Sequence, residues 1–140
     1  MKILLPVDGS DYTMRMLAYL GAHGELLSGG HEYVLFTAVA PIPLRAARFL
    51  DSSIVDGYYS DQAEPVLRPV REFAVQHGWK FRACHAHGHA AEAIAEIVDV
   101  EKPDLIVMGT HGQSSLGNML LGSVVTGVLA RCTVPVLLIR

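Results

Sequence analysis

Short apolar runs rich in β-branched residues alternate along this chain with segments whose apolar residues recur at helical spacing. That alternation is typical of βαβ units, in which parallel strands are joined by helices. Several runs have no polar face, as expected of strands covered on both sides. We therefore predict a single α/β domain over residues 1–140, an open parallel sheet with strands at Ile3–Val7, Tyr33–Val39, Lys80–His85, Leu105–Met108 and Val134–Ile139.

Four helices are predicted between these strands. The first is capped by Ser10 or Asp11 and ends near Gly29-Gly30, because such residues favour helix starts and glycine favours helix ends. The second covers about Asp61–His77. The apolar faces of the third and fourth consist of Ala90, Ile94, Ile97 and Val98, and of Val124, Val125, Val128, Leu129 and Cys132.

The segment Ala40–Ser60 has two prolines and no clean period, so we predict a long loop there. Its cations Arg45 and Arg48 could act as a lid if a phosphate site lies beside it. The alternative is that both side chains are simply solvated.

Composition excludes several classes of protein. With 51% hydrophobic and 18% charged residues the chain can bury a core and is not disordered. A net charge of −3 and the lack of a Lys/Arg run argue against a nucleic-acid partner. The apolar part Met119–Ala130 is shorter than the ~20 residues that a bilayer requires, so we expect no membrane span.

The cysteines and the first residues of the chain indicate its cellular compartment. Cys84 and Cys132 are too few and too far apart for a disulfide framework or a zinc knuckle. The opening run Met1–Asp8 meets an acidic residue early and has no small-residue cleavage site, unlike a signal peptide. We expect a cytoplasmic protein with two reduced thiols.

The segment after the fourth predicted strand is the richest in candidate binding residues. Ligands of open parallel sheets bind beyond the carboxyl ends of the strands. Gly109 and Gly112 leave the backbone open there, and Gly122-Ser123 starts a helix whose N–H groups and dipole suit a phosphate chain. A loop that uses glycine only for its turns remains an alternative. The Walker pattern is absent, since no Lys or Arg occurs between Lys102 and Arg131.

These residues resemble a known family. The spacing Gly109-x-x-Gly112-(nine residues)-Gly122-Ser123 is similar to the Gly-x-x-Gly-x9-Gly-Ser/Thr pattern of the ATP-binding universal stress proteins. The opening run Ile3–Ser10 looks like the first strand of that family, and His87-Gly88 looks like the end of its third strand. The resemblance covers nearly the whole chain except Ala40–Ser60.

The resemblance implies a five-stranded parallel sheet in the order 3-2-1-4-5 with helices on both faces, as in adenine nucleotide alpha hydrolases. It also implies ATP, with Mg, at the switch between strands one and four, and a homodimer paired through Pro135–Ile139. Such a protein would serve in stress response or regulation, with its conformation or its binding of a protein partner dependent on the nucleotide. The residues that the resemblance places around adenine and ribose are Pro6, Val7, Asp8, Val39, Met108 and Gly109, with the Asp8 carboxylate toward sugar hydroxyls or adenine. Those that it places around the phosphates are His111, Gly112, Gly122, Ser123 and Val124.

Two other functions remain open. A slow ATPase could use the same site, although the loop offers no cation and only His111 or Asp8 as a base. Alternatively, a related scaffold could bind a metal or another small ligand through His85, His87 and His89, because His85 and His87 share one strand face. We predict no metal site as the main function, and we assign no residue a catalytic role.

Overall fold

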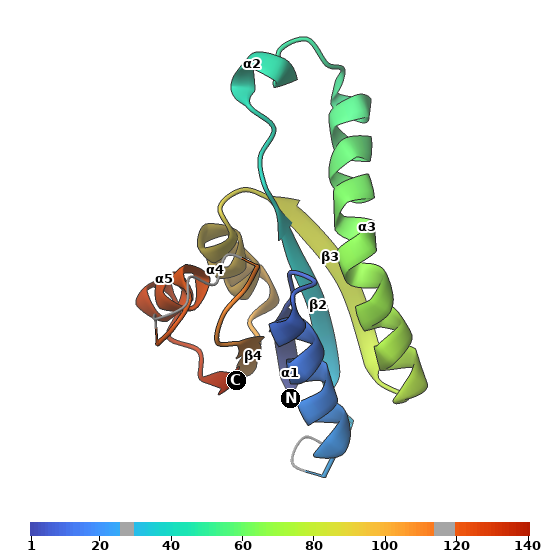
Figure 1. The fold of residues 1–140 in the computed structure, drawn as a ribbon, viewed down its shortest axis with the longest axis vertical. Helices are drawn as coiled ribbons and strands as arrows, with labels where there is room; N and C mark the ends of the chain where they lie inside the picture. The colour runs from blue at the N-terminus through green and yellow to red at the C-terminus, as the bar shows by residue number, and fades with distance from the viewer. Residues whose placement is uncertain (26–29, 114–119) are drawn as a thin grey trace.

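The computed structural model describes residues 1–25, 30–113 and 120–140. Within these ranges one five-stranded parallel sheet has the order β3-β2-β1-β4-β5, which confirms the expected fold class and strand order (Figure 1). The strands are β1 (Lys2–Pro6), β2 (Glu32–Val39), β3 (Lys80–His87), β4 (Leu105–Gly109) and β5 (Val136–Ile139). Their carboxyl ends lie at one edge, where the order reverses between β1 and β4.

Helices cover both faces of the sheet. They are α1 (Asp11–Ala22), α2 (Leu44–Ala47), α3 (Ser52–Gln76), α4 (Ala90–Glu101) and α5 (Ser123–Arg131). One apolar cluster joins α1 and α3 to the sheet through residues such as Leu5 and Leu35, and a second joins α4 and α5 through Leu4 and Phe36. Neighbouring residues of a strand therefore enter opposite cores, which explains why these strands lack a polar face. No helix in the described ranges is long and apolar enough to cross a membrane.

The prediction of a loop over Ala40–Ser60 is wrong. The segment contains α2 and the first turns of α3, which begins at Ser52 instead of Asp61 and ends at Gln76. Buried residues of α3 recur at helical spacing from Tyr59 through Ala63 to Val70. The part of the helix that packs on the sheet continues without a break into the exposed turns that begin at Ser52. Gly57 and the paired tyrosines beside it concealed this period in the sequence.

The predicted end of the first helix is also wrong, because α1 ends at Ala22 and not near Gly29-Gly30. Residues 26–29, including Leu27 of the predicted apolar face, lie outside the described ranges. The helix start is as predicted, with Ser10 at the N-cap and Asp11 as the first helical residue. Ser10 does not cap through its hydroxyl, however, and that oxygen is buried with no hydrogen-bond partner among the described residues.

Every strand differs from its predicted bounds by one or two residues, and the largest differences are at the end of β3 and the start of β5. β3 extends to His87, because it stays paired with β2 up to the Val39–His87 pair. β5 begins at Val136 instead of Val134, since pairing with β4 starts at the Ile106–Val136 pair. Pro135, just before the strand, still accepts a hydrogen bond from the Ile106 N–H through its carbonyl. The sheet thus has the predicted strand order, while the strand boundaries shift by one or two residues.

Candidate functional site

A cavity of about 830 Å³ lies at the carboxyl ends of β1, β2 and β4. Ligand pockets typically measure about 300–1,000 Å³, so this cavity has room for a nucleotide-sized molecule. Its walls come from the residues that follow β1, from the end of β2, from one side of α3 and α4, and from the start of α5. The cavity therefore occupies the position in which open parallel sheets bind their ligands.

Asp8 anchors the floor of this cavity through several hydrogen bonds. Its Oδ1 accepts from the Ser10 N–H and the Thr13 hydroxyl, each at 3.0 Å, which closes a tight turn after β1. Its Oδ2 accepts from the Gln113 N–H at 3.1 Å. Each carboxylate oxygen accepts about two hydrogen bonds, so Oδ2 retains one acceptor position toward a ligand.

The N-terminus of α5 opens into the same cavity. Gly122 is the N-cap, and its N–H already donates to the Thr110 carbonyl at 2.8 Å. The next three N–H groups, those of Ser123, Val124 and Val125, have no acceptor within the helix because they belong to its first turn. They line the cavity together with the positive end of the helix dipole. The arrangement can bind an anion such as phosphate.

Glycine at position 122 is required by close backbone packing. A Cβ there would lie 3.2 Å from both the Thr110 carbonyl oxygen and the His111 Cα. Ser123 is the first helical residue instead of the cap, so its hydroxyl is not used to cap α5. Ser123 is exposed and lines the cavity.

His111 connects the cavity wall to α1. Its ring lies 5.1 Å from the Tyr12 ring at a tilt of 40°, and the Arg15 guanidinium lies 5.2 Å from the centre of the Tyr12 ring. Its Nδ1 is 3.1 Å from the Thr110 hydroxyl. The tyrosine thus links the histidine in the cavity wall to a cation of α1.

All the residues predicted for the site line this one cavity. They are Pro6, Val7, Asp8, Val39, Met108, Gly109, His111, Gly112, Gly122, Ser123 and Val124. The predicted loop residues 114–119 lie outside the described ranges. Sequence reasoning missed further lining residues, most of them in helices and strand interiors, namely Thr13, Phe36, Thr37, Ala38, Ala40, Gln62, Val66, Ala90, Ile94, Gln113 and Val125. Of these, Ala40, Gln113 and Val125 directly follow a predicted site residue in the chain.

The histidines of β3 do not form a metal site in the part of the chain that the structure describes. No group of three or more His, Cys, Asp or Glu side chains there could hold a metal ion. The His87 ring instead stacks on the Tyr59 ring at 4.5 Å, and His89 is the N-cap of α4. His87 thus packs against α3, and His89 stands at the N-cap position of α4 without a side-chain capping hydrogen bond.

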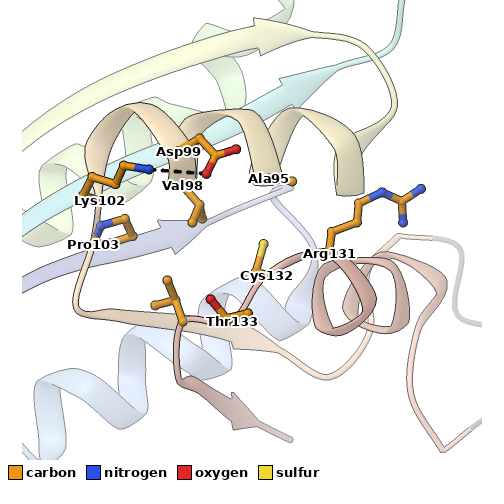
Figure 2. A pocket seen from close by; sticks show the side chains of 9 residues that line it. Ala95, Val98, Asp99, Lys102, Pro103, Arg131, Cys132 and Thr133 are labelled. Carbon is orange, nitrogen blue, oxygen red and sulfur yellow. Dashed lines mark ion pairs between the residues drawn. The ribbon is translucent and has the colours of Figure 1, made fainter.

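A second, smaller pocket of about 230 Å³ lies between the ends of α4 and α5 (Figure 2). Lys102 at its edge forms an ion pair with Asp99 at 3.5 Å, and the Cys132 side chain points toward α4. Burial raises the pKa of the Cys132 thiol, and the Asp99 carboxylate raises it further, against a lowering by Arg131. A pocket of this size with a protonated thiol suits neither a nucleotide nor nucleophilic chemistry.

Comparison with known proteins decides the family. The model of the universal stress protein family matches residues 1–140. The chain belongs to the universal stress protein family. A universal stress protein of Thermus aquaticus, encoded beside a QAH/OAS sulfhydrylase gene, is 33% identical over 139 residues, covering 99% of this chain and 97% of the relative.

Solved structures agree with this assignment to the universal stress proteins. Protein MJ0577, a universal stress protein of Methanocaldococcus jannaschii, has a TM-score of 0.81 and 26% identity, over 99% of this chain and 94% of its own. A universal stress protein in complex with cAMP has a TM-score of 0.71 and 23% identity, over 100% and 97% of the two chains. The latter similarity establishes a shared fold.

Proposed function

We propose that this chain binds an adenine nucleotide, with ATP as the preferred ligand, in the 830 Å³ cavity. The observation that carries the proposal is the first turn of α5, whose N–H groups and the Ser123 hydroxyl line the same cavity as the glycine segment after β4. Such a helix start binds phosphate without lysine or arginine. The related fold bound to cAMP supports adenine as the base.

Other residues of the cavity lining suit a base and a sugar. Val39 and Val66 contribute apolar surface, and Met108 contributes a polarisable thioether that packs well against flat rings. Asp8 Oδ2 has one acceptor position for a sugar hydroxyl or the adenine amino group. The ligand would thus lie with adenine between β1 and β2 and its phosphates at α5.

Magnesium would enter with the phosphates of ATP. Mg²⁺ in nucleotide sites is held mainly by phosphate oxygens and water, with few protein ligands. The described residues offer no acidic cluster of their own, so Ser123 is the protein group that we assign to the ion or to a phosphate oxygen.

The site favours binding over turnover. No Lys or Arg belongs to the described cavity lining, whereas phosphoryl transfer requires neutralisation of charge on the transferred group. Three hydrogen bonds already engage the Asp8 carboxylate, which makes it a poor general base. We therefore propose a regulatory protein of the stress response in the cytoplasm, whose conformation or binding of a protein partner changes with bound nucleotide.

Calorimetric titration with Mg-ATP tests the site. We expect saturable binding to the full chain and about a 10- to 150-fold loss in Ser123→Ala, the value of a hydrogen bond to a charged group. Thr126→Val is the matched control: it removes a hydroxyl from the same helix, and the Gly122 carbonyl that this hydroxyl contacts still accepts from the Thr126 N–H. Equal affinities for ATP in the full chain and Ser123→Ala would refute this assignment.

We also propose that two copies pair through β5. The two edges of the sheet differ: β3 carries exposed Lys80 and Arg82, which discourage pairing, whereas β5 presents half-exposed Val136, Leu137 and Leu138. The Pro135 and Ile139 carbonyls bond to β4, so by alternation the Leu138 N–H points away from β4.

Leu138→Pro tests pairing through β5, because it removes an outward N–H and leaves the hydrogen bonds to β4 in place. We expect this variant to lose the β5 dimer in sedimentation experiments while its circular dichroism spectrum stays that of the parent chain. A folded variant with the same sedimentation behaviour as the parent would contradict pairing through β5.

A further inference from the structure

Residues 41–58 form an arm that projects beyond the end of the sheet (Figure 1). The arm contains α2 and the first turns of α3. Within it only Ile42, Ala47 and Val55 are half-buried, and every other residue is exposed. Helical turns with so few contacts are marginal in water, because a short helix gains most of its stability from packing.

The base of the arm is fixed to the body of the protein. The Tyr59 side chain is buried, its ring stacks on His87, and its hydroxyl accepts a hydrogen bond from the Ile42 N–H at 3.0 Å. The arm therefore starts from a defined anchor. The anchor at Tyr59 fixes the position in which the arm is exposed.

The arm carries a concentration of exposed apolar side chains. Phe49 is 89% exposed, Leu44 80% and Ile54 53%, and Leu50 and Tyr58 are also exposed. Apolar residues this close together on a surface mark an interaction site more often than scattered ones do. The arm is thus an unpartnered apolar surface.

One side of α3 within the arm permits close approach by another helix. Ile54, Gly57 and Asp61 recur at three- and four-residue spacing and lie on the side opposite buried Tyr59 and Ala63. A Cβ added at Gly57 would have no atom within 4 Å, so the backbone there is open.

Charges on and beside the arm identify the partner. Arg45 and Arg48 lie on and beside α2, whereas Asp51, Asp56 and Asp61 lie at the start of α3 and along it. None of these five side chains forms an ion pair with another residue in the described ranges. A surface with unmatched charges of both signs is complementary to a copy of itself related by a two-fold axis.

We propose that the arm is an interface between two copies of this chain, in which α2 of each copy packs against the outer side of α3 of the other. A membrane surface fits less well, because anionic lipids would face the three aspartates. The arm lies beside β2 and β3, at the far side of the sheet from β5, so both contacts can form in one assembly. The arm interface does not depend on nucleotide binding.

Sedimentation velocity over a range of concentrations tests the apolar contact. We expect Phe49→Asp to weaken self-association through the arm by about tenfold or more, as for a central aromatic contact. Val100→Asp is the matched control, since Val100 is 74% exposed on α4, away from the arm. Neither substitution lies in β5, so any pairing through β5 contributes equally to the association measured for both variants. Unchanged association in Phe49→Asp, or a chain monomeric throughout, would overturn the proposal.

Charge reversal distinguishes a second copy from any other partner. One variant combines Arg45→Glu with Arg48→Glu, and the other carries Asp61→Lys, which changes the aspartate on the outer side of α3. Each alone places like charges across the proposed interface and should associate more weakly than the parent chain. Their equimolar mixture restores opposite charges on both sides of the two-fold axis and should recover the parent association. A mixture that stays as weak as its components would refute pairing between copies.

Discussion

Gln113 donates two hydrogen bonds to Asp8, from its N–H to Oδ2 at 3.1 Å and from its side-chain Nε2 to the main-chain oxygen at 2.6 Å. The two residues are far apart in sequence, and they join the segment after β4 to the turn after β1. The contact spans the point where the strand order reverses. It holds the glycine segment in place beside the cavity before any ligand arrives.

The Gln113 side chain should contribute to nucleotide affinity. Gln113→Ala removes the bond to the Asp8 main-chain oxygen and leaves the backbone bond, so the segment becomes less well ordered before binding. We expect ATP affinity to fall about 2- to 10-fold, the net value of one hydrogen bond, as measured by calorimetry. Gln76→Ala, at the exposed end of α3, is the control. Equal affinities for the two variants would show that the contact has no part in binding.

Gly112 should tolerate no larger residue without a rearrangement. A Cβ at this position would lie 2.4 Å from Asp8 Oδ2, so either the carboxylate or the loop must move. We expect Gly112→Ala to lower the free energy of unfolding by about 1–3 kcal/mol in urea denaturation, as for other overpacked positions. Gly24→Ala should change it little, because a Cβ there meets no atom within 4 Å. A fully stable Gly112→Ala would mean that Asp8 is free to turn away.

Stability should decrease at alkaline pH. Burial raises the pKa of the Tyr33 phenol and of the Cys84 thiol above their ordinary values of 10.0 and 9.0. The folded chain thus holds these protons more tightly than the unfolded chain does. Their contribution is complete below the ordinary values and is lost as the pH rises through the raised ones.

Urea midpoints measured with a reductant present test this pH dependence. We expect the midpoint to stay level up to about pH 8.5 and to fall above it. Cys84→Ala should reduce the first part of the fall without abolishing it, because the pKa of the Cys132 thiol is also raised from 9.0 and that group remains. A midpoint that rises with pH would contradict the assigned direction.

The sequence predicted the sheet and the cavity lining better than the helix ends. Strand positions follow from apolar runs, and residues that directly follow strands meet at one edge, so Asp8, Val39 and His111 could be placed together. Gln62 and Val66 could not, because they reach the cavity only through the path of α3 across the sheet. Thr13 pairs with Asp8 through a turn that no periodicity reveals.

Glycine was the main source of error in the helices. Gly57 hid the start of α3, although its position in the helix is open and unstrained. Gly21 within α1 has a spatial role, since a Cβ there would lie 2.9 Å from ring atoms of Phe73 and His77 at the end of α3. Because Gly21 has no Cβ, α1 and α3 can pack closely on the same face of the sheet.

The most direct test of nucleotide binding is a thermal unfolding scan with and without Mg-ATP, on protein shown by mass spectrometry to carry no nucleotide. Ligand at about 100 times its dissociation constant should add about 2.7 kcal/mol, a rise in Tm of several degrees for a domain of this size. We expect that rise in the parent chain and a smaller one in Ser123→Ala. An unchanged Tm in the parent chain at saturating Mg-ATP would contradict the proposal that this cavity is a nucleotide site.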